Sequence, residues 1–316
     1  MSKSHSVDIL EAGLVMKMAR APATSEKLAR EVLQIKRLCH VHPQQMVPVN
    51  HEGSIDGRTF YTLEKKSGAS LSSIVFDPNR PLPLKRLALQ QALEQIKQAI
   101  AREQAQAPEV PLDLRGWLEL EWQQVQPLHG LLAEHPTFNG LRFEHSFADH
   151  YRRACRFANS ERFSSVQAAH LNFHFGNVLQ HEPSGQIFFI DPDDSLKGLD
   201  PLFGLARFAF SFWHEIATEG RGSVLVQRDA GASHYRLAQA EHQQLLDGIP
   251  ELRSLAGLHA WVADEDRRRL YALTVYCFLR SIRLNAEPAA DPAASQANVQ
   301  QVLALGCLSL LGASKP

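Results

Sequence analysis

The sequence has few cysteines and almost no net charge. Its four cysteines, Cys39, Cys155, Cys277 and Cys307, are scattered without C-x-x-C spacing, which argues against a disulfide framework or a cysteine zinc site. The 33 Lys+Arg and 34 Asp+Glu residues leave a net charge of −1 with histidine neutral, so the chain lacks the basic field that binds nucleic acid or a membrane surface. We therefore expect a reducing, cytoplasmic location and neither a nucleic-acid nor a membrane partner.

Long hydrophobic runs are also absent. The longest apolar stretch, Val302 to Leu311, is about half the length that spans a bilayer, and we expect it to form a buried C-terminal helix. Asp8 and Glu11 interrupt the apolar residues near the N-terminus, so we expect no export signal. The 44% hydrophobic and 21% charged residues are typical of a globular chain. No heptad pattern or long apolar seam is present, and we expect a monomer or weak dimer.

The first 66 residues show strand patterns around one helix. Val7–Leu10 and Leu14–Met18 are short apolar runs separated by a turn sequence, which predicts a hairpin. Thr24 or Ser25 is expected to cap a helix that runs to about His40, and Phe60–Leu63 reads as a further strand. We predict a small α+β unit over residues 1–66.

Residues 67–316 form the second predicted domain, which is mostly helical. The segments with helical spacing of apolar residues are Pro83–Gln106, Trp117–Leu132, Ser146–Ala158, Pro201–Thr218, Ala238–Leu245, Glu265–Leu284 and Ser295–Leu311. One β-like interruption, Asn177–Asp191, is expected within this domain.

The interruption reads as an antiparallel hairpin. Val178–Leu179 and Ile187–Ile190 are apolar strands joined by a turn about Ser184. Asn177 precedes the first strand and Asp191 follows the second, so the hairpin brings both side chains to one end. An amide oxygen beside a carboxylate is a donor set that Mg²⁺ accepts. The alternative is a hairpin whose ends are merely polar.

A lysine and a glutamate stand at apolar positions in the first unit. Lys17 lies among Leu14–Met18, and Glu31 falls on the apolar stripe of the predicted helix, three residues after Leu28 and four before Ile35. Buried charges need partners, so we expect the two to pair, as in kinase-like enzymes that aim a lysine at nucleotide phosphates. The alternative is a snorkelling Lys17 and a solvated Glu31.

The run His170-Leu-Asn-Phe-His-Phe-Gly-Asn177 resembles the H-G-D-x-H-x-x-N loop of the aminoglycoside phosphotransferase and choline kinase group. Asp191 matches the metal-binding aspartate of that group, and Asp200–Ala206 resembles its G-D-P-x-x-D-L-A run. Phe60–Lys65 resembles the hinge strand, and Gly68–Leu71 fits its G-x-S-L sequence.

This resemblance implies an α+β, two-lobed protein-kinase-like fold with ATP and Mg²⁺ as cofactors. Lys17, held by Glu31, contacts phosphates, and Asn177 and Asp191 hold Mg²⁺. The hinge around Glu64, Lys65 and Lys66 binds the base. Asn172 positions the acceptor and His170 braces the loop. The implied activity is transfer of the γ-phosphate to a hydroxyl of a small molecule such as a sugar or an amino alcohol.

The chain departs from the pattern in two places. Asn172 stands where the family has its catalytic aspartate, and an amide does not accept a proton as a carboxylate does. His174, Asp193 and Asp194 are the alternative bases. Only sixteen residues precede Lys17, so the first strand and its glycine-containing loop are expected to be absent or very short. Both departures favour the alternative of a catalytically impaired pseudokinase that acts as a nucleotide-binding or regulatory module.

Three further patterns have a structural and a functional interpretation. His170 and His174 stand at i,i+4, the spacing of metal ligands on a helix, although their aromatic neighbours favour an orienting role. His40 and His42 are expected to be an exposed helix end. A separate group of side chains has the chemistry to bind an acceptor but is also explained by helix packing: Trp117, Glu119, Glu121, Trp122, Asp149 and His150.

Overall fold

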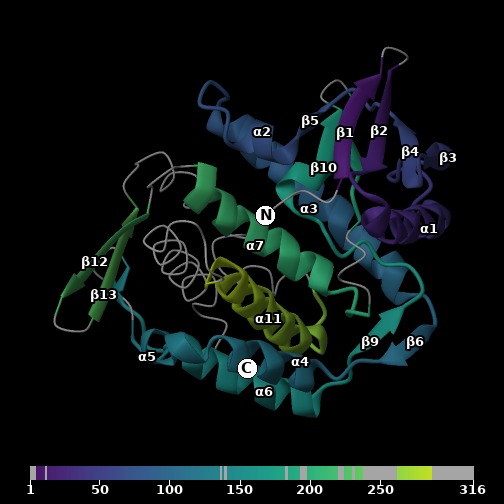
Figure 1. The fold of residues 1–316 in the computed structure, drawn as a ribbon. Coiled ribbons are helices and arrows are strands. Elements are labelled where there is room, and N and C mark those ends of the chain that lie inside the picture. Colours follow the sequence, from purple (N-terminus) through teal and green to yellow (C-terminus); the bar gives the residue numbers. More distant parts are fainter. Residues whose placement is uncertain are drawn as a thin grey trace. The chain divides into compact units, whose positions relative to one another are not determined.

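The structure is a computed structural model that describes residues 5–10, 13–135, 137–138, 141–181, 184–192, 198–219, 224–229, 232–237 and 262–286. The chain forms two compact units (Figure 1). Unit 1 comprises residues Met1–Val110 and Ser165–Gly204, and unit 2 comprises Pro111–Ser164 and Leu205–Pro316. The predicted lobe boundary near residue 66 lies inside unit 1 and stays a prediction. The helices predicted over 238–245 and 295–311 lie outside the described residues. No described helix combines the length and apolar composition that crossing a membrane requires.

Unit 1 begins with a four-stranded antiparallel sheet. Its strands are β1 (His5–Leu10), β2 (Leu14–Ala19), β3 (Val49–Ile55) and β4 (Arg58–Glu64), in the order β1-β2-β4-β3. The predicted hairpin and the strand over 60–63 are confirmed. β3 was not predicted because most of its residues are exposed, so it lacks the apolar alternation that marks a half-buried strand.

Helix α1 (Ser25–Val41) packs against this sheet (Figure 1). Its buried residues are Leu28, Glu31, Val32, Ile35 and Leu38, the stripe expected from their spacing. Thr24 precedes the helix but makes no side-chain cap; its hydroxyl donates to the carbonyl of Ala21. The helix therefore depends on its buried face more than on its cap.

The second sheet of unit 1 has the strand order β11-β10-β5. The remaining elements of unit 1 are η1 (Pro22–Thr24), β5 (Ala69–Ser70), α2 (Leu71–Val75), α3 (Leu82–Gln104), η3 (Phe175–Asn177), β10 (Val178–His181) and β11 (Gln186–Phe189). The predicted β10–β11 hairpin is confirmed. Gly68 permits the approach of β5 to β10, because a Cβ there would lie 2.7 Å from the carbonyl oxygen of Gln180.

The helices α4 (Leu114–Gln124), α6 (Phe147–Ser160) and α11 (Asp266–Ala286) pack together in unit 2. The other elements of unit 2 are η2 (Gln126–Leu128), α5 (His129–Leu132), β7 (Thr137–Phe138), β8 (Leu141–Arg142), α7 (Phe203–Glu219), β12 (Val224–Asp229) and β13 (Ala232–Leu237). Most residues of the paired strands β6 (Pro108–Pro111) and β9 (Ser164–Val166) belong to unit 1.

Two predictions about unit 2 were wrong. The single helix expected over 117–132 is interrupted, because Pro127 cannot continue a helical ladder and lies in η2. The hairpin of β12 and β13 joins β7 and β8 in a sheet of order β12-β13-β7-β8, so Asn177–Asp191 is not the only β interruption of the helical region.

Two of the candidate acceptor-binding side chains, Trp122 and Glu121, contact other side chains of unit 2. Trp122 is stacked between His129 and Tyr151, with ring centroids 4.4 and 4.1 Å away. Glu121 is buried and accepts from the guanidinium of Arg283 at 2.5 Å. These contacts favour the packing interpretation for both residues.

The buried His150 is expected to make the folded state of unit 2 less stable at acidic pH. Its ring is buried and its Nδ1 lies 2.6 Å from the hydroxyl of Tyr271. Burial, assisted by the charges of His145 and Arg153, lowers the pKa of His150 to about 3. As the pH falls, His150 is protonated near pH 6.5 in the unfolded chain but only near pH 3 in the folded chain. The stability contributed by neutral His150 is therefore complete above about pH 6.5 and is lost as the pH falls toward 3. We expect a loss of roughly 2 to 5 kcal/mol over this window.

All four tryptophans belong to unit 2, so denaturation followed by tryptophan fluorescence between pH 7 and pH 4 measures this loss. The variant His150→Gln is expected to have a shallower pH dependence, whereas His40→Gln, at an exposed position of α1, keeps that of the parent. Equal slopes for His150→Gln and the parent would refute the assignment.

Candidate functional site

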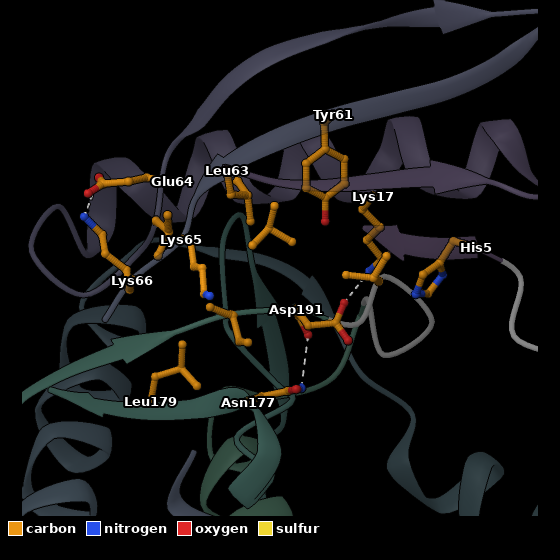
Figure 2. A pocket seen from close by; sticks show the side chains of 14 residues that line it. His5, Lys17, Tyr61, Leu63, Glu64, Lys65, Lys66, Asn177, Leu179 and Asp191 are labelled. Atoms are coloured by element: carbon orange, nitrogen blue, oxygen red, sulfur yellow. Dashed lines mark hydrogen bonds and ion pairs between the residues drawn. The ribbon is translucent and has the colours of Figure 1, made fainter. Parts of the chain in front are cut away.

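Unit 1 contains a pocket of about 250 Å³. One wall is the inner face of the β1-β2-β4 sheet, and the other is formed by β10 and the residues that follow β11 (Figure 2). The residues that line it are His5, Val7, Val15, Lys17, Val47, Tyr61, Leu63, Glu64, Lys65, Lys66, Asn177, Leu179, Ile190 and Asp191. The pocket thus combines apolar walls with charged groups at its ends.

Lys17 is the buried cation of the pocket. Its Nζ lies 2.6 Å from Oε1 of Glu31 and also pairs with the carboxylate of Asp191. Burial alone lowers the pKa of Lys17, but the charges of Glu31 and Asp191 outweigh it and raise the pKa above its ordinary value. Tyr61, opposite Lys17 in the sheet, donates its hydroxyl to Glu31 at 2.6 Å. The expected Lys17–Glu31 pair is present, and Tyr61 supports it.

Asp191 has an unusual backbone conformation. Its φ is 54°, in the left-handed region that few non-glycine residues occupy and that is common at functional sites. Its side chain is 47% exposed and points into the pocket (Figure 2). Burial raises the pKa of Asp191, but Lys17, and then the charge of His5, lower it below its ordinary value. Asp191 is therefore an ionised carboxylate at neutral pH.

Two asparagine amides hold the Asp191 backbone. Nδ2 of Asn172 donates to the Asp191 carbonyl at 3.1 Å, and Nδ2 of Asn177 donates to the same carbonyl at 3.3 Å. Asn177 also donates to the carbonyl of Asn172 at 3.2 Å. Since the nitrogen of Asn177 is committed to these carbonyls, its amide oxygen is the atom left to accept or to coordinate.

His170 contacts the backbone of the residue that precedes Asp191. Its Nε2 is 3.1 Å from the carbonyl of Ile190; a carbonyl only accepts, so Nε2 carries the proton. Burial lowers the pKa of His170 to about 4, and the ring is neutral at pH 7. The position agrees with the predicted bracing of the loop.

A buried carboxylate supports the same loop. Oε1 of Glu103 on α3 accepts the backbone N–H of His170 at 2.8 Å and lies 2.9 Å from Nε2 of His42. Glu103 and His42 are both fully buried. The expectation that His42 belongs to an exposed helix end was wrong, because His42 follows the last turn of α1 and turns inward to meet Glu103.

His174 has a different environment. It precedes η3, and its Nδ1 accepts the backbone N–H of Gly176 at 2.9 Å. The neutral ring then carries its proton on Nε2, so accepting a further proton breaks this hydrogen bond. The contact opposes the role of base, which stays a prediction for His174.

The predicted hinge residues Glu64, Lys65 and Lys66 line the opposite end of the pocket from Asp191 (Figure 2). Lys66 pairs with Glu64 at 2.6 Å and lies over the ring of Phe188. The backbone N–H of Lys65 donates to Gly13 at 2.8 Å, which ties the hinge to the turn between β1 and β2. These contacts hold the segment at the pocket edge.

Six of the ten predicted site residues line the pocket: Lys17, Glu64, Lys65, Lys66, Asn177 and Asp191. Glu31 and Asn172 lie behind the lining, where they contact Lys17 and the Asp191 carbonyl. His170 lies below them, and His174 is absent from the pocket lining. Two residues of this region were not predicted to have a role: Tyr61 and Glu103. The alternation of side chains along β4 could have indicated that Tyr61 shares a sheet face with Lys17 of β2. No local sequence pattern links Glu103 to His42 or His170.

The donor chemistry fits a magnesium ion that also binds phosphate. In the described part of the chain, no cluster of three or more His, Cys, Asp and Glu side chains is arranged to hold a metal. Mg²⁺ differs from metals that need such clusters, since it binds one or two protein oxygens together with substrate phosphates and water. The amide oxygen of Asn177 and the carboxylate of Asp191 fit this pattern.

A small antiparallel sheet followed by a mostly helical region, with the loop and hairpin described above, defines a two-lobed protein-kinase-like fold, as predicted from the resemblance. The chain is similar to the GDP complex of wild-type aminoglycoside 2'-phosphotransferase-IIIa, with a TM-score of 0.53, 14% identity and coverage of 96% of this chain and 90% of that chain. It is also similar to the GDP and kanamycin complex of APH(2")-IIia, with a TM-score of 0.50 at the same identity and coverage. No protein-family model and no curated protein matches the sequence. At 14% identity these likenesses establish the fold alone.

Proposed function

We propose that this protein is a small-molecule kinase that transfers the γ-phosphate of ATP, with Mg²⁺, to an acceptor hydroxyl such as that of a sugar or an amino alcohol. One observation carries the proposal. A single pocket joins the hinge, the Lys17–Glu31 pair, Asn177 and the strained Asp191. Without a nucleotide function, the burial of a lysine between two carboxylates has little physical reason.

Each residue has a distinct role in this proposal. The backbone of Glu64–Lys66 binds the base, between the apolar side chains of the two pocket walls. Lys17, oriented by Glu31 and Tyr61, binds the α- and β-phosphates. Asn177 and Asp191 would hold Mg²⁺, which when bound neutralises charge on the phosphates. Asn172 and His170 hold the loop, and the acceptor lies beside Asn172.

The transfer step needs little covalent chemistry from the protein. The acceptor oxygen forms a bond to the γ-phosphorus, and the bond from that phosphorus to the bridging oxygen breaks. ADP leaves with the electron pair, and the hydroxyl proton is released to water. Because this transition state is loose, positioning and charge neutralisation matter more than early removal of the proton, so the absence of a carboxylate at 172 lowers the rate without preventing the reaction.

A second candidate is a nucleotide-binding module without transferase activity. The observation that favours it is the commitment of the Asn172 amide to the Asp191 carbonyl. The two candidates differ in one measurement, the release of ADP in the presence of hydroxyl acceptors.

We also propose a cytoplasmic location, since Cys39, Cys155 and Cys277 are free thiols of the kind kept reduced there.

The nucleotide site is tested by calorimetric titration of ATP with and without Mg²⁺. We expect the parent to bind, and Lys17→Ala to bind at least tenfold more weakly because it loses the phosphate cation and leaves Glu31 and Asp191 without their cationic partner. Asp191→Ala is expected to lose the dependence on Mg²⁺. GTP is titrated in parallel because the two similar structures contain GDP.

Lys36→Ala is the matched control, because Lys36 pairs with Glu52 on the surface and lies outside the pocket. Its affinity for ATP is expected to equal that of the parent. If the parent binds neither ATP nor GTP at millimolar concentration, the nucleotide function is wrong. If Asp191→Ala keeps its response to Mg²⁺, Asp191 does not belong to the metal site.

A further inference from the structure

His5 occupies the end of the pocket opposite the hinge. It is the first residue of β1 and pairs with Ala19, whereas Leu14 pairs with Glu64 at the other end of the sheet. Leu14 and Ala19 are five positions apart on β2, so the two ends are separated by about 17 Å along the strand. Figure 2 shows the same order, with Glu64–Lys66 at one end and His5 at the other.

The side chain of His5 lies on the pocket face of the sheet. Side chains that are paired across antiparallel strands share a face, and so do alternate residues of one strand. His5 therefore shares its face with Val7 and with Lys17, the partner of Val7. All three residues line the pocket, and the imidazole of His5 lies near the carboxylate of Asp191 (Figure 2).

A nucleotide whose base contacts the hinge would extend along the sheet toward Lys17. Its base and sugar would lie between the hinge and Lys17, and its outermost phosphates would lie next to His5 and Asp191. An imidazole N–H donates to phosphate oxygen, and a charged donor or acceptor strengthens such hydrogen bonds. Val7 and Val15, between His5 and the hinge, offer apolar contact and no donor from their side chains.

We propose that His5 binds the terminal phosphates of the nucleotide and makes the site selective for di- and triphosphates over monophosphates. This inference rests on the proposed nucleotide function and adds to it a residue and a selectivity. The pocket then has two positive or hydrogen-bond-donating side chains at its phosphate end, with Lys17 at the inner phosphates and His5 at the outer ones.

The experiment is calorimetric titration of AMP, ADP and ATP into the parent, His5→Ala and His51→Ala. His51 is the matched control, because it lies at an exposed position of β3 in the same sheet and outside the pocket. Loss of one phosphate hydrogen bond at a half-exposed position is expected to weaken ATP binding about five- to tenfold. AMP binding is expected to change by less than about twofold, and His51→Ala is expected to match the parent.

The outcomes separate this inference from the proposed function. A selective loss of ATP affinity in His5→Ala supports the inference. If the parent binds ATP and His5→Ala binds it equally well, or if AMP is weakened as much as ATP, the phosphate role of His5 is wrong while the nucleotide function stands. If the parent binds no nucleotide, the proposed function is wrong, and this inference with it. Equal thermal unfolding temperatures of the three proteins show that the comparison concerns folded chains.

Discussion

Asn172→Asp is expected to lower the affinity for Mg²⁺ and ATP, although it introduces the residue that the resembling family has at this position. The amide of Asn172 donates to the carbonyl oxygen of Asp191 at 3.1 Å. A carboxylate has no proton to donate at neutral pH, so the substitution puts two acceptors in contact at a part-buried position. The strained Asp191 backbone then loses one of the two amide donors that hold it.

We expect about a tenfold to hundredfold loss of Mg²⁺-dependent ATP affinity, the range for the loss of a hydrogen bond worth about 1 to 3 kcal/mol. Asn172→Ala removes the donor without adding a charge and is expected to lose less. Asn50→Asp, at an exposed position of β3, makes the same chemical change outside the pocket and is expected to bind ATP like the parent. The measurement is calorimetry, with ADP release assayed on the same samples.

A higher rate of ADP release in Asn172→Asp would contradict this expectation. It would show that the site keeps the geometry for a catalytic carboxylate and that the chain is a slow transferase limited by its asparagine. The sequence leaves both outcomes open, and the hydrogen bond from Asn172 to Asp191 favours the loss.

Glu103→Ala is expected to have the largest effect on stability. The carboxylate of Glu103 is fully buried, accepts the backbone N–H of His170 at 2.8 Å and contacts Nε2 of His42 at 2.9 Å. Its removal leaves both of these groups buried without a partner. We expect the free energy of unfolding to fall by about 3 to 5 kcal/mol, because each of two buried polar groups that lose their partner costs about 1 to 3 kcal/mol.

Denaturation followed by circular dichroism measures this loss. Glu103→Gln keeps an acceptor for the His170 N–H and is expected to lose less than Glu103→Ala. Glu94→Ala is the matched control, because Glu94 is exposed on the same helix and contacts only Gln98 among the hydrogen bonds described for it; its change is expected to stay within about 0.5 kcal/mol. A loss in Glu103→Ala as small as that of the control would show that the buried network contributes no stability.

The strand and helix patterns of unit 1 were predictable because they are local. The short apolar runs Val7–Leu10 and Leu14–Met18, the stripe of α1 and the β10–β11 hairpin are patterns of a few residues, and the structure has each of these elements. Elements that violate a simple period were missed. β3 is almost wholly exposed, and the predicted helix over 117–132 contains Pro127, which interrupts it.

The candidate site was predictable only where a charged residue stood in an apolar pattern or a loop resembled a known family. Lys17 and Glu31 are such charges, and His170–Asn177 is such a loop. His42 and Glu103 had no signal of this kind. His42 follows a helix like many exposed polar residues, and its partner lies 61 residues away on another helix.

The amino-acid sequence by itself indicated the β1–β2 and β10–β11 hairpins, helix α1 with Glu31 on its apolar stripe, and the meeting of Asn177 with Asp191 at one end of a hairpin. These features follow from the side-chain period and from short loops, whose closure restricts the chain strongly. Only the tertiary structure decided that Asn172 donates to the Asp191 backbone, that Glu103 joins His42 to the loop, and that His5 shares a pocket with Asp191. Each of these contacts joins elements from distant parts of the chain, and the packing of several elements together, which no local period encodes, determines which distant groups meet.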